Sequence, residues 1–401
     1  MSCLRQIRSR LLARVHRLVS EGNAEVVLID FSHYEVVAAF IRILAPACRR
    51  VTVIAPQWII GTIERTVGLE HDNLDLLMIP DESLDSIKSV ERILATGSFD
   101  LCVVSTINEN YEAWRRSLGI FAGKKIVVIH NANFWFQKRR HLKLFRVPRG
   151  REHRSMLRLA RDADAVVALS GAVKSYIHEK YGRSWQVVES TTCIAGSAFK
   201  QLSGTGQLRL VVPGQIERHR RDYDLLLRAV KRIGKDRIAL HLLGLPFGDY
   251  GQAIIETCRQ MVAEGFGIFW NDTYVSQGEF DKAMSECSAI LSPIVVETSY
   301  AGISETYGRS KITGVFADIV RYRIPAIVPA SLQAPVQLES ALRRYSSEDD
   351  LVSALSDMTR PEVIGDLRGH AVTNAEFWQP HLVRSRFLAE LRAAQIELSP
   401  S

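Results

Sequence analysis

The chain has 401 residues, and because one hydrophobic core rarely serves more than about 250–300 residues, we expect two domains. Its composition is that of an ordinary globular protein, with 47% hydrophobic and 24% charged residues and a formal net charge of +7. No apolar run approaches the length that a membrane-spanning helix needs, so no such helix is expected.

The six cysteines form no C-x-x-C pair, and most of them lie in apolar runs. They indicate buried thiols in a reducing cytoplasm, not a disulfide framework or a zinc site. The basic segment 4–18 has apolar residues at helical spacing but lacks the continuous apolar region of a signal peptide. We expect a docked terminal helix there, with a position on a membrane surface as the alternative. The predicted location is the cytoplasm, and a peripheral association with the inner face of the plasma membrane stays open.

Strand-like and helix-like runs alternate along the first half of the chain. Short apolar runs predict strands at residues 24–29, 51–54, 100–105, 125–130 and 165–169. A helix is expected at residues 34–44, and Ser170 is placed to cap another that runs to Tyr181. Apolar strands that alternate with helices indicate a parallel sheet covered on both faces.

A basic segment interrupts this pattern at residues 134–161, where ten Lys or Arg residues face one acid, Glu152. Aromatic residues are interleaved with the basic ones. This combination suits anionic lipid headgroups, a phosphorylated ligand or nucleic acid, and the alternative is a solvated pair of basic helices. We predict that this segment forms a ligand-binding or membrane-facing surface that contains Arg139, Arg140, Lys143 and Arg146.

The second half repeats the alternation. Strands are predicted at residues 208–212, 238–243, 267–270, 289–291 and 326–328. Asp222 should cap a helix that ends at Gly234, and Ser276 with Glu279 forms a capping box. Further helices are expected at residues 250–263, 309–322, 349–355 and 374–391.

The domain boundary is expected in the Gly/Ser-rich stretch 192–207. The fold class is therefore α/β, with two Rossmann-like doubly wound domains that face a central cleft, where ligands of open α/β sheets bind. We expect an N-terminal domain at residues 1–195 and a second domain at residues 196–375. The helix at residues 376–401 is expected to pack back toward the N-terminal domain.

Two basic loops follow strands of the second half. Gly214 permits a tight exit from the first of these strands, and Arg218, Arg220 and Arg221 then crowd the start of a helix. In the second loop, Tyr307 and Gly308 form a turn before Ser310 and Lys311, ahead of an apolar helix. Basic residues and free backbone N–H groups at helix starts favour a phosphate, so the two loops predict a diphosphate site. The alternative is a solvated cluster of charges.

These residues resemble nucleotide-sugar glycosyltransferases of the GT-B fold, similar to families 4 and 1. The resemblance rests on Pro213-Gly-x-Ile216, Arg220-Arg-Asp-Tyr223 and Glu305-x-Tyr-Gly308, and on residues 163–170 in the first half. In that family an arginine and a lysine of the first loop hold the donor diphosphate, and these positions correspond here to Gln215 and Arg220. Of the family's two glutamates, spaced eight positions apart, Glu305 matches the first, whereas Thr313 occupies the position of the second.

The resemblance implies a metal-independent hexosyltransferase-like enzyme, without a cofactor, that moves a sugar from a nucleotide donor to a glycan or lipid-linked acceptor. Cell-surface polysaccharide or glycoconjugate synthesis is the expected context. It assigns a catalytic role to His130 and Glu305, with His33 and Asp30 as alternatives at strand ends. The expected donor-binding residues are Gly214, Arg218, Arg220, Tyr307, Gly308, Ser310, Lys311 and Thr313.

Other interpretations stay open. Asp162 and Asp164, and likewise Asp222 and Asp224, form D-x-D pairs that we interpret as structural, so no metal is expected. A nucleotide-sugar epimerase would need acids in the cleft and no acceptor surface, which the basic segment disfavours. The missing glutamate at position 313 favours a non-catalytic nucleotide-sugar-binding scaffold. A nucleic-acid binder would rest on the basic segment alone, and no nucleic-acid partner is expected.

Overall fold

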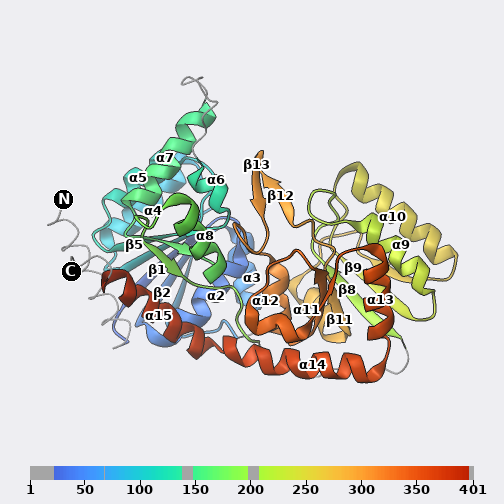
Figure 1. The fold of residues 1–401 in the computed structure, drawn as a ribbon. Helices are drawn as coiled ribbons and strands as arrows, with labels where there is room; N and C mark the ends of the chain where they lie inside the picture. Colours follow the sequence, from blue (N-terminus) through green and yellow to red (C-terminus); the bar gives the residue numbers. More distant parts are fainter. Residues whose placement is uncertain (1–21, 67, 138–147, 197–206, 397–401) are drawn as a thin grey trace. The chain divides into compact units, whose positions relative to one another are not determined.

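The computed structural model describes residues 22–66, 68–137, 148–196 and 207–396. The chain divides into two compact units (Figure 1). The first unit comprises Met1–Thr192, Ser310–Ile312 and Pro380–Ser401, and the second comprises Cys193–Arg309 and Thr313–Gln379. The predicted surface residues Arg139, Arg140, Lys143 and Arg146 lie outside the described residues, as does most of the expected linker.

The first unit is built on a parallel seven-stranded sheet with the order β3-β2-β1-β4-β5-β6-β7. Its strands are β1 (Glu25–Asp30), β2 (Arg50–Ala55), β3 (Leu74–Met78), β4 (Leu101–Thr106), β5 (Lys124–Ile129), β6 (Ala165–Ala168) and β7 (Val187–Glu189). Strand order reverses beside β1, because β2 and β3 lie on one side of it and β4 to β7 on the other.

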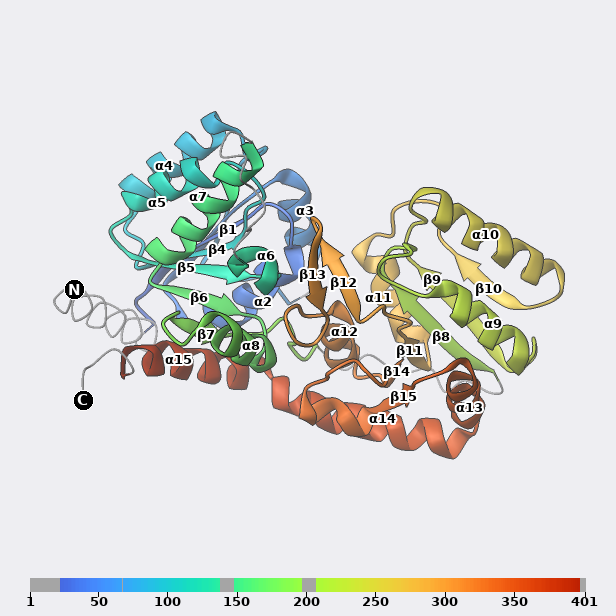
Figure 2. The ribbon, with the colours of Figure 1, turned by 45° about the horizontal axis from the view of Figure 1, so that its top comes forward.

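Helices cover both faces of this sheet (Figure 2). They are α2 (Tyr34–Leu44), α3 (Gln57–Arg65), α4 (Leu84–Thr96), α5 (Tyr111–Gly119), α6 (Ala132–Phe136), α7 (Pro148–Asp162), α8 (Gly171–Tyr181) and α15 (Pro380–Ile396). Residues of α4, α5 and α7 pack on one face, against Val27 and Ile29 of β1. On the other side α2 meets α15, where the rings of Phe40 and Phe387 lie 5.7 Å apart. Because both faces are covered, β1 is buried along its whole length.

The second unit is built on a parallel six-stranded sheet with the order β10-β9-β8-β11-β14-β15. Its strands are β8 (Leu208–Pro213), β9 (Ile238–Leu243), β10 (Gly267–Trp270), β11 (Ala289–Leu291), β14 (Ala326–Pro329) and β15 (Leu342–Tyr345). Strand order reverses between β8 and β11, as it does between β1 and β4 in the first unit. A separate antiparallel hairpin joins β12 (Glu297–Tyr300) to β13 (Ile303–Thr306).

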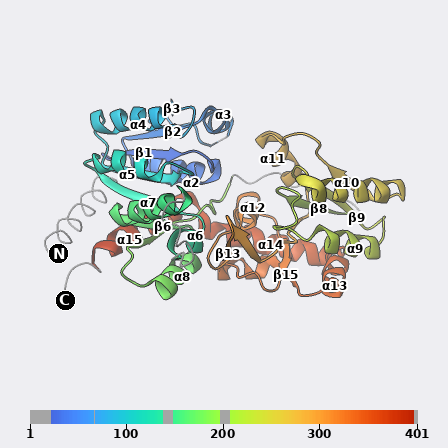
Figure 3. The same ribbon diagram turned by 90° about the horizontal axis from the view of Figure 1, so that it is seen from above.

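Helices also flank the second sheet, as the view from above shows (Figure 3). They are α9 (Tyr223–Ile233), α10 (Gly248–Ala263), α11 (Gln277–Glu286), α12 (Gly314–Tyr322), α13 (Glu348–Met358) and α14 (Pro361–Ala375). Leu226, Leu227 and Val230 of α9 pack into the core beside Leu351 and Leu355 of α13. The α/β fold class with two Rossmann-like domains, predicted from the sequence, is confirmed.

Local signals in the sequence account for several helix boundaries. The Asp222 carboxylate accepts from Leu225 N at 2.9 Å, and Gly234 ends α9 with φ +101°. Ser276 and Glu279 form the predicted capping box of α11. Ser170 caps α8. Each cap satisfies backbone groups that the first or last helical turn leaves without a partner.

Two predicted helices differ from the structure. The helix expected at residues 309–322 begins at Gly314, and Thr313 is its N-cap. The residues before it belong to the β12–β13 hairpin and the turn that follows, an element that the sequence did not predict because β12 is largely exposed. The helix expected at residues 374–391 is interrupted: its first two residues end α14, a 3₁₀ turn follows, and Pro380 starts α15.

Both aspartates of the first D-x-D pair make ion pairs within the first unit. Asp164 Oδ1 lies 2.7 Å from Lys124 Nζ, both side chains are buried, and Asp164 Oδ2 accepts from Lys125 N at 2.9 Å. Asp162 pairs with Arg115 at 3.1 Å on an exposed surface. In the second pair, Asp222 caps α9 and Asp224 accepts from the Tyr250 hydroxyl. These contacts give all four aspartates a structural role.

The buried pair should therefore matter far more for stability than its exposed neighbour. We expect Asp164→Asn to lower the free energy of unfolding by about 3–5 kcal/mol, because Lys124 is left charged and buried without its partner. Asp162→Asn, two positions away, should change the urea midpoint little, since exposed pairs contribute little. Equal small shifts for the two variants in urea unfolding would contradict the structural assignment of Asp164.

Candidate functional site

Polar side chains gather at the carboxyl edge of the first sheet, where its strand order reverses. Asp30 is the last residue of β1, Ser105 and Thr106 end β4, and His130 directly follows β5. These three strands are neighbours in the sheet. The reversal of strand order in a parallel sheet is the usual place for a ligand, so this edge is the candidate site of the first unit.

Asp30 is fully buried and shapes the loop that follows β1. Its Oδ1 atom accepts from the backbone N–H groups of Ser32 and His33, each at 2.6 Å. Within the described part of the chain, its Oδ2 atom and the Ser105 hydroxyl have no hydrogen bond of good geometry. Burial raises the pKa of the Asp30 carboxyl, and the nearby Ser105 hydroxyl together with the two N–H donors opposes this rise.

His130 is half-buried, and its ring stacks on that of exposed His33 with centroids 4.3 Å apart. Its Nε2 atom lies 3.0 Å from both Ser105 O and Thr106 Oγ1. Since a carbonyl oxygen can only accept, we assign the proton to Nε2, which leaves Nδ1 as the acceptor. Burial, together with the positive charges of His33 and Lys311, lowers the pKa of His130 to about 3. The neutral imidazole is therefore the form present near pH 7.

Lys311 lies beside His130 in the first unit, not at a helix start as predicted. An antiparallel bridge links it to Asn131, and Ala132 N donates to Ser310 O at 2.9 Å. Ser310 is fully buried, and Ile312 packs against the first core. Three non-local residues thus extend the edge formed by β1, β4 and β5. The helix prediction was wrong because Thr313, three residues beyond Ser310, is the side chain that caps α12.

In the second unit, the loop after β8 forms the corresponding edge. Gly214 has φ +90°, and an added Cβ would lie 2.4 Å from Arg221 Nη2, so only glycine fits without displacing that side chain. Arg221 Nη1 donates to Gln215 O at 3.2 Å, which folds the side chain back over the loop. Across the strand reversal, Asp222 N donates to Pro293 O at 2.8 Å, just after β11. The loops after β8 and β11 therefore meet.

The three arginines of this loop have different surroundings. Exposed Arg220 pairs with Glu217 at 2.9 Å, which neutralises part of its charge. The guanidinium of Arg218 lies 5.2 Å from the centre of the Tyr250 ring. Arg221 is half-buried and lies directly at the strand exit. Of the three, Arg221 is the best placed toward the strand reversal, although the sequence favoured Arg218 and Arg220 as ligands.

The hairpin and its following turn complete this edge. Tyr307 N donates to Val296 O at 2.9 Å, and the residue is buried. Burial raises the pKa of Tyr307, and the charges of Arg220 and Arg221 oppose this rise, which places the phenol near the arginines. Gly308 has φ +83°, and an added Cβ would lie 2.2 Å from Gln333 O. The structure thus brings Gly214, Arg220 and Tyr307 into one region of the second unit.

Glu305 and Thr313, the two positions of the degenerate motif, are also buried in the second unit. Glu305 is fully buried in β13, opposite Thr298 of β12. Thr313 Oγ1 accepts from Val315 N at 3.4 Å as the N-cap of α12. A glutamate at position 313 would replace this cap, so the threonine has a structural use of its own.

None of the helices in the part of the chain that the structure describes is both long enough and apolar enough to cross a bilayer. No three His, Cys, Asp or Glu side chains of that part of the chain gather into a group suited to a metal ion.

Comparisons with known proteins place the fold among GT-B proteins. No protein-family model and no curated protein sequence matches the chain. Among solved structures, HepE from Anabaena, in complex with UDP-glucose, is similar with a TM-score of 0.64 and 11% identity over 92% of this chain and 99% of that one. Sucrose-phosphate synthase from Thermosynechococcus elongatus has a TM-score of 0.61 at 12% identity, over 94% and 100% of the two chains.

A third similar structure is that of a protein assigned as a UDP-N-acetylglucosamine 2-epimerase from Listeria monocytogenes. Its TM-score is 0.54 at 12% identity, over 92% of this chain and 95% of that one. At such identities the likeness concerns the fold. The fold predicted from the resemblance to GT-B glycosyltransferases is thereby confirmed.

The protonation of His130 can be tested directly. We expect the His130 ring to stay neutral, with the proton on Nε2, down to about pH 4, because burial and two nearby positive charges disfavour the imidazolium. Long-range ¹H–¹⁵N NMR of the histidine rings measures both the tautomer and the pKa, with His130→Gln used to assign the signal. A ring that titrates near pH 6.5 would contradict the lowered pKa of His130.

The same shift predicts a change in stability with pH. A histidine whose pKa is lowered on folding stabilises the protein fully above the unfolded value near 6.5, and this contribution is lost as the pH falls toward 3. Between pH 7 and 4.5 the loss should be on the order of 2 kcal/mol. His130→Gln lacks this loss, so its urea midpoint should fall less steeply with decreasing pH than that of the wild type.

Proposed function

We propose that the protein is a glycosyltransferase that transfers a sugar from a nucleoside-diphosphate donor. The observation that carries the proposal is the loop after β8, where Gly214, Arg221 and Tyr307 gather at the strand reversal of the second domain. The fold similarity to HepE, which was crystallised with UDP-glucose, supports UDP as the nucleotide. We therefore propose that the second domain binds the donor.

The departing diphosphate gains negative charge as the bond to the sugar breaks. Arg221 and Arg220 would stabilise that charge, and the first turn of α12 has no acidic residue to oppose an anion near its N-terminus. We propose that these groups act without a metal, because the aspartates of both D-x-D pairs are used in caps, ion pairs and a tyrosine contact. Loss of activity in EDTA, restored by magnesium or manganese, would contradict this part of the proposal.

The first domain would bind the acceptor. A neutral His130 is a poor general base at pH 7, since a base with a pKa of about 3 holds a proton weakly. We propose that it contacts the transferred sugar through Nδ1, and that exposed His33, which stacks on it, is the better candidate to accept a proton. Glu305 would contact the donor sugar. A glycan or lipid-linked acceptor, cell-surface polysaccharide synthesis and a peripheral place on the inner membrane face remain part of this proposal.

An epimerase is the second candidate, favoured by the similarity to the Listeria protein. Such an enzyme would convert UDP-N-acetylglucosamine without any acceptor, whereas a transferase releases UDP in proportion to added acceptor. Analysis of the sugar product distinguishes the two. A non-catalytic scaffold would bind UDP and turn over neither substrate.

The donor site is tested by the arginine at the strand exit. We expect Arg221→Ala to weaken UDP binding about 10-fold to 100-fold, because a charge-assisted hydrogen bond contributes roughly 1.5–3 kcal/mol. Isothermal titration with UDP measures the effect. Arg228→Ala is the matched control, since Arg228 lies on α9, the helix that follows this loop, and pairs with Glu348 at 2.8 Å. Equal affinities of the two variants would contradict the site.

The proposed catalytic residues are tested by separating turnover from binding. We expect His130→Ala and Glu305→Gln each to lower kcat at least 10-fold while the affinity for UDP changes less than threefold, because both side chains should act on the sugar. Steady-state kinetics with UDP-glucose and calorimetry with UDP give the two quantities. Asp162→Asn should keep full turnover. Unchanged kcat in His130→Ala would move the assignment to His33.

A further inference from the structure

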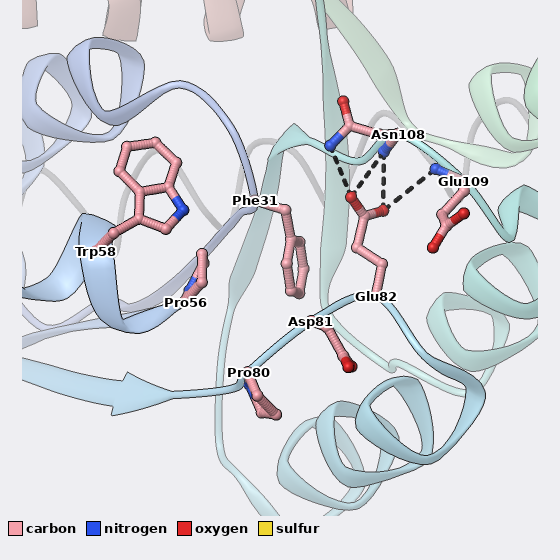
Figure 4. Close-up of a pocket in the computed structure, with 8 residues that line it drawn as sticks. All are labelled: Phe31, Pro56, Trp58, Pro80, Asp81, Glu82, Asn108 and Glu109. Atoms are coloured by element: carbon pink, nitrogen blue, oxygen red, sulfur yellow. Dashed lines mark hydrogen bonds between the residues drawn. The ribbon is translucent and has the colours of Figure 1, made fainter. Parts of the chain in front are cut away.

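The first unit contains a cavity of about 390 Å³. Neither Asp30 nor His130 lines this cavity. Figure 4 shows its lining: Phe31, Pro56, Trp58, Pro80, Asp81, Glu82, Asn108 and Glu109. These residues follow β1, β2, β3 and β4, which are adjacent in the sheet, so the cavity lies at the carboxyl edge that also holds Asp30. Its volume suits a small ligand such as one sugar ring.

One wall of the cavity is fixed by Glu82. This side chain is buried, and its carboxylate accepts from Asn108 N at 2.8 and 3.0 Å and from Asn108 Nδ2 at 2.7 Å. Glu109 N donates to the same carboxylate at 3.3 Å, and Asn110 Nδ2 donates to Glu82 O at 2.8 Å. These bonds tie the loop after β3 to the loop after β4. The wall is therefore preorganised, and Glu82 itself has little capacity left for a ligand.

A second wall is aromatic. Trp58 lies in the first turn of α3 with 51% of its surface exposed, although its neighbours Ile59 and Ile60 are buried. Figure 4 shows the indole beside Pro56, with the Phe31 ring between it and the acidic residues. Because half of its surface is exposed, the Trp58 indole contributes little to the packing of the core. It offers a flat apolar face on which the C–H face of a sugar ring can stack.

The remaining wall is acidic. The cavity is lined by three carboxyl groups, those of Asp81, Glu82 and Glu109, and its lining includes no Lys, Arg or His. Asp81 Oδ1 accepts from Ser83 N at 3.0 Å and from Ser86 Oγ at 2.7 Å. The nearby Ser83 hydroxyl, together with these two bonds, lowers the pKa of Asp81, which stays ionised. In the described part of the chain, the Glu109 carboxylate has no hydrogen-bond or ion-pair partner.

This arrangement selects ligands by charge. Ionised carboxylates only accept hydrogen bonds, so they favour hydroxyl and ammonium donors, and they repel phosphate, sulfate and carboxylate groups. A ligand with hydroxyls along one edge and an apolar face is a sugar ring. The acidic lining contrasts with the phosphorylated or anionic-lipid partner that the basic segment 134–161 predicts.

We propose that this cavity binds an uncharged or amino-bearing sugar ring of the acceptor, stacked on Trp58 with its hydroxyl or amino groups donating to Glu109 and Asp81. The identification of this sugar as part of an acceptor rests on the proposed transferase function. The binding itself does not, because it requires neither donor nor turnover. Phosphorylated sugars are excluded from the cavity.

The experiment measures saccharide binding by the full chain without a donor, using ligand-observed NMR titrations. The probes are the methyl glycosides of glucose, galactose and mannose, then glucosamine, and finally glucose 6-phosphate. We expect at least one neutral glycoside or glucosamine to bind saturably, and glucose 6-phosphate to bind at least 10-fold more weakly. Saturable binding of none of the neutral or amino sugars, or tighter binding of the phosphorylated one, would overturn the proposal.

Matched variants locate the binding. Trp58→Ala should weaken it at least fivefold, whereas Phe269→Ala, which removes a 59% exposed aromatic ring of the second unit, should leave it unchanged. Glu109→Gln should weaken the binding of glucosamine more than that of a methyl glycoside, since the substitution removes the negative charge of the side chain and keeps its shape. Equal affinities of the Trp58 and Phe269 variants would contradict the site.

The UDP affinity of the same samples separates this proposal from the donor assignment. Retained UDP binding without saccharide binding contradicts the cavity alone. Retained saccharide binding without UDP binding contradicts the donor site and leaves the cavity intact as a saccharide site.

Discussion

Parallel strand pairing is the constraint on which the rest of the structure depends. In each of the two large sheets all strands run in one direction, so every strand ends at the same edge, and residues from distant loops must meet there. The reversal of strand order between β1 and β4, and again between β8 and β11, separates the loops at one point of that edge. Polar residues can gather there without breaking the apolar core below.

The buried Asp30 side chain is unfavourable for stability, and it orders the loop that follows β1. Removing a carboxylate from water is unfavourable, and two backbone N–H donors offset only part of this cost. Those donors belong to the loop that carries His33, whose ring stacks on His130. Asp30 thus fixes the loop, the loop positions the His33 imidazole, and the half-buried His130 imidazole that stacks on it is neutral near pH 7. A single buried carboxyl group organises the polar edge of the first unit.

The loop after β8 in the second unit and the cavity of the first unit differ in charge. The edge of the second unit holds arginines around Gly214, where an anion is favoured. The cavity of the first unit is lined by carboxyl groups, where an anion is opposed. Under the proposed function, electrostatics would favour the nucleoside diphosphate at the second unit and an uncharged sugar at the first.

The sequence by itself determined the elements whose signals are local. Apolar runs defined the buried strands such as β1 and β4, and single polar side chains defined the starts of α8, α9 and α11. The exposed β12 and the partly exposed edge strand β3 carry no such signal, because neither is buried on both faces. These strands form because they pair with a neighbouring strand, β12 with β13 and β3 with β2.

Only the tertiary structure decided which residues share a site. Lys311 follows Arg309 by two positions, yet it lies beside His130, since its backbone pairs with Asn131. The acidic cavity joins residues between positions 31 and 109 that no local pattern connects. The spacing of residues along the chain indicates only local features, namely helix caps and the periodicity of helices and strands. The lowered pKa of His130 and the pairing of Lys311 with Asn131 depend on the packing of the whole sheet, so they could not be predicted from the sequence.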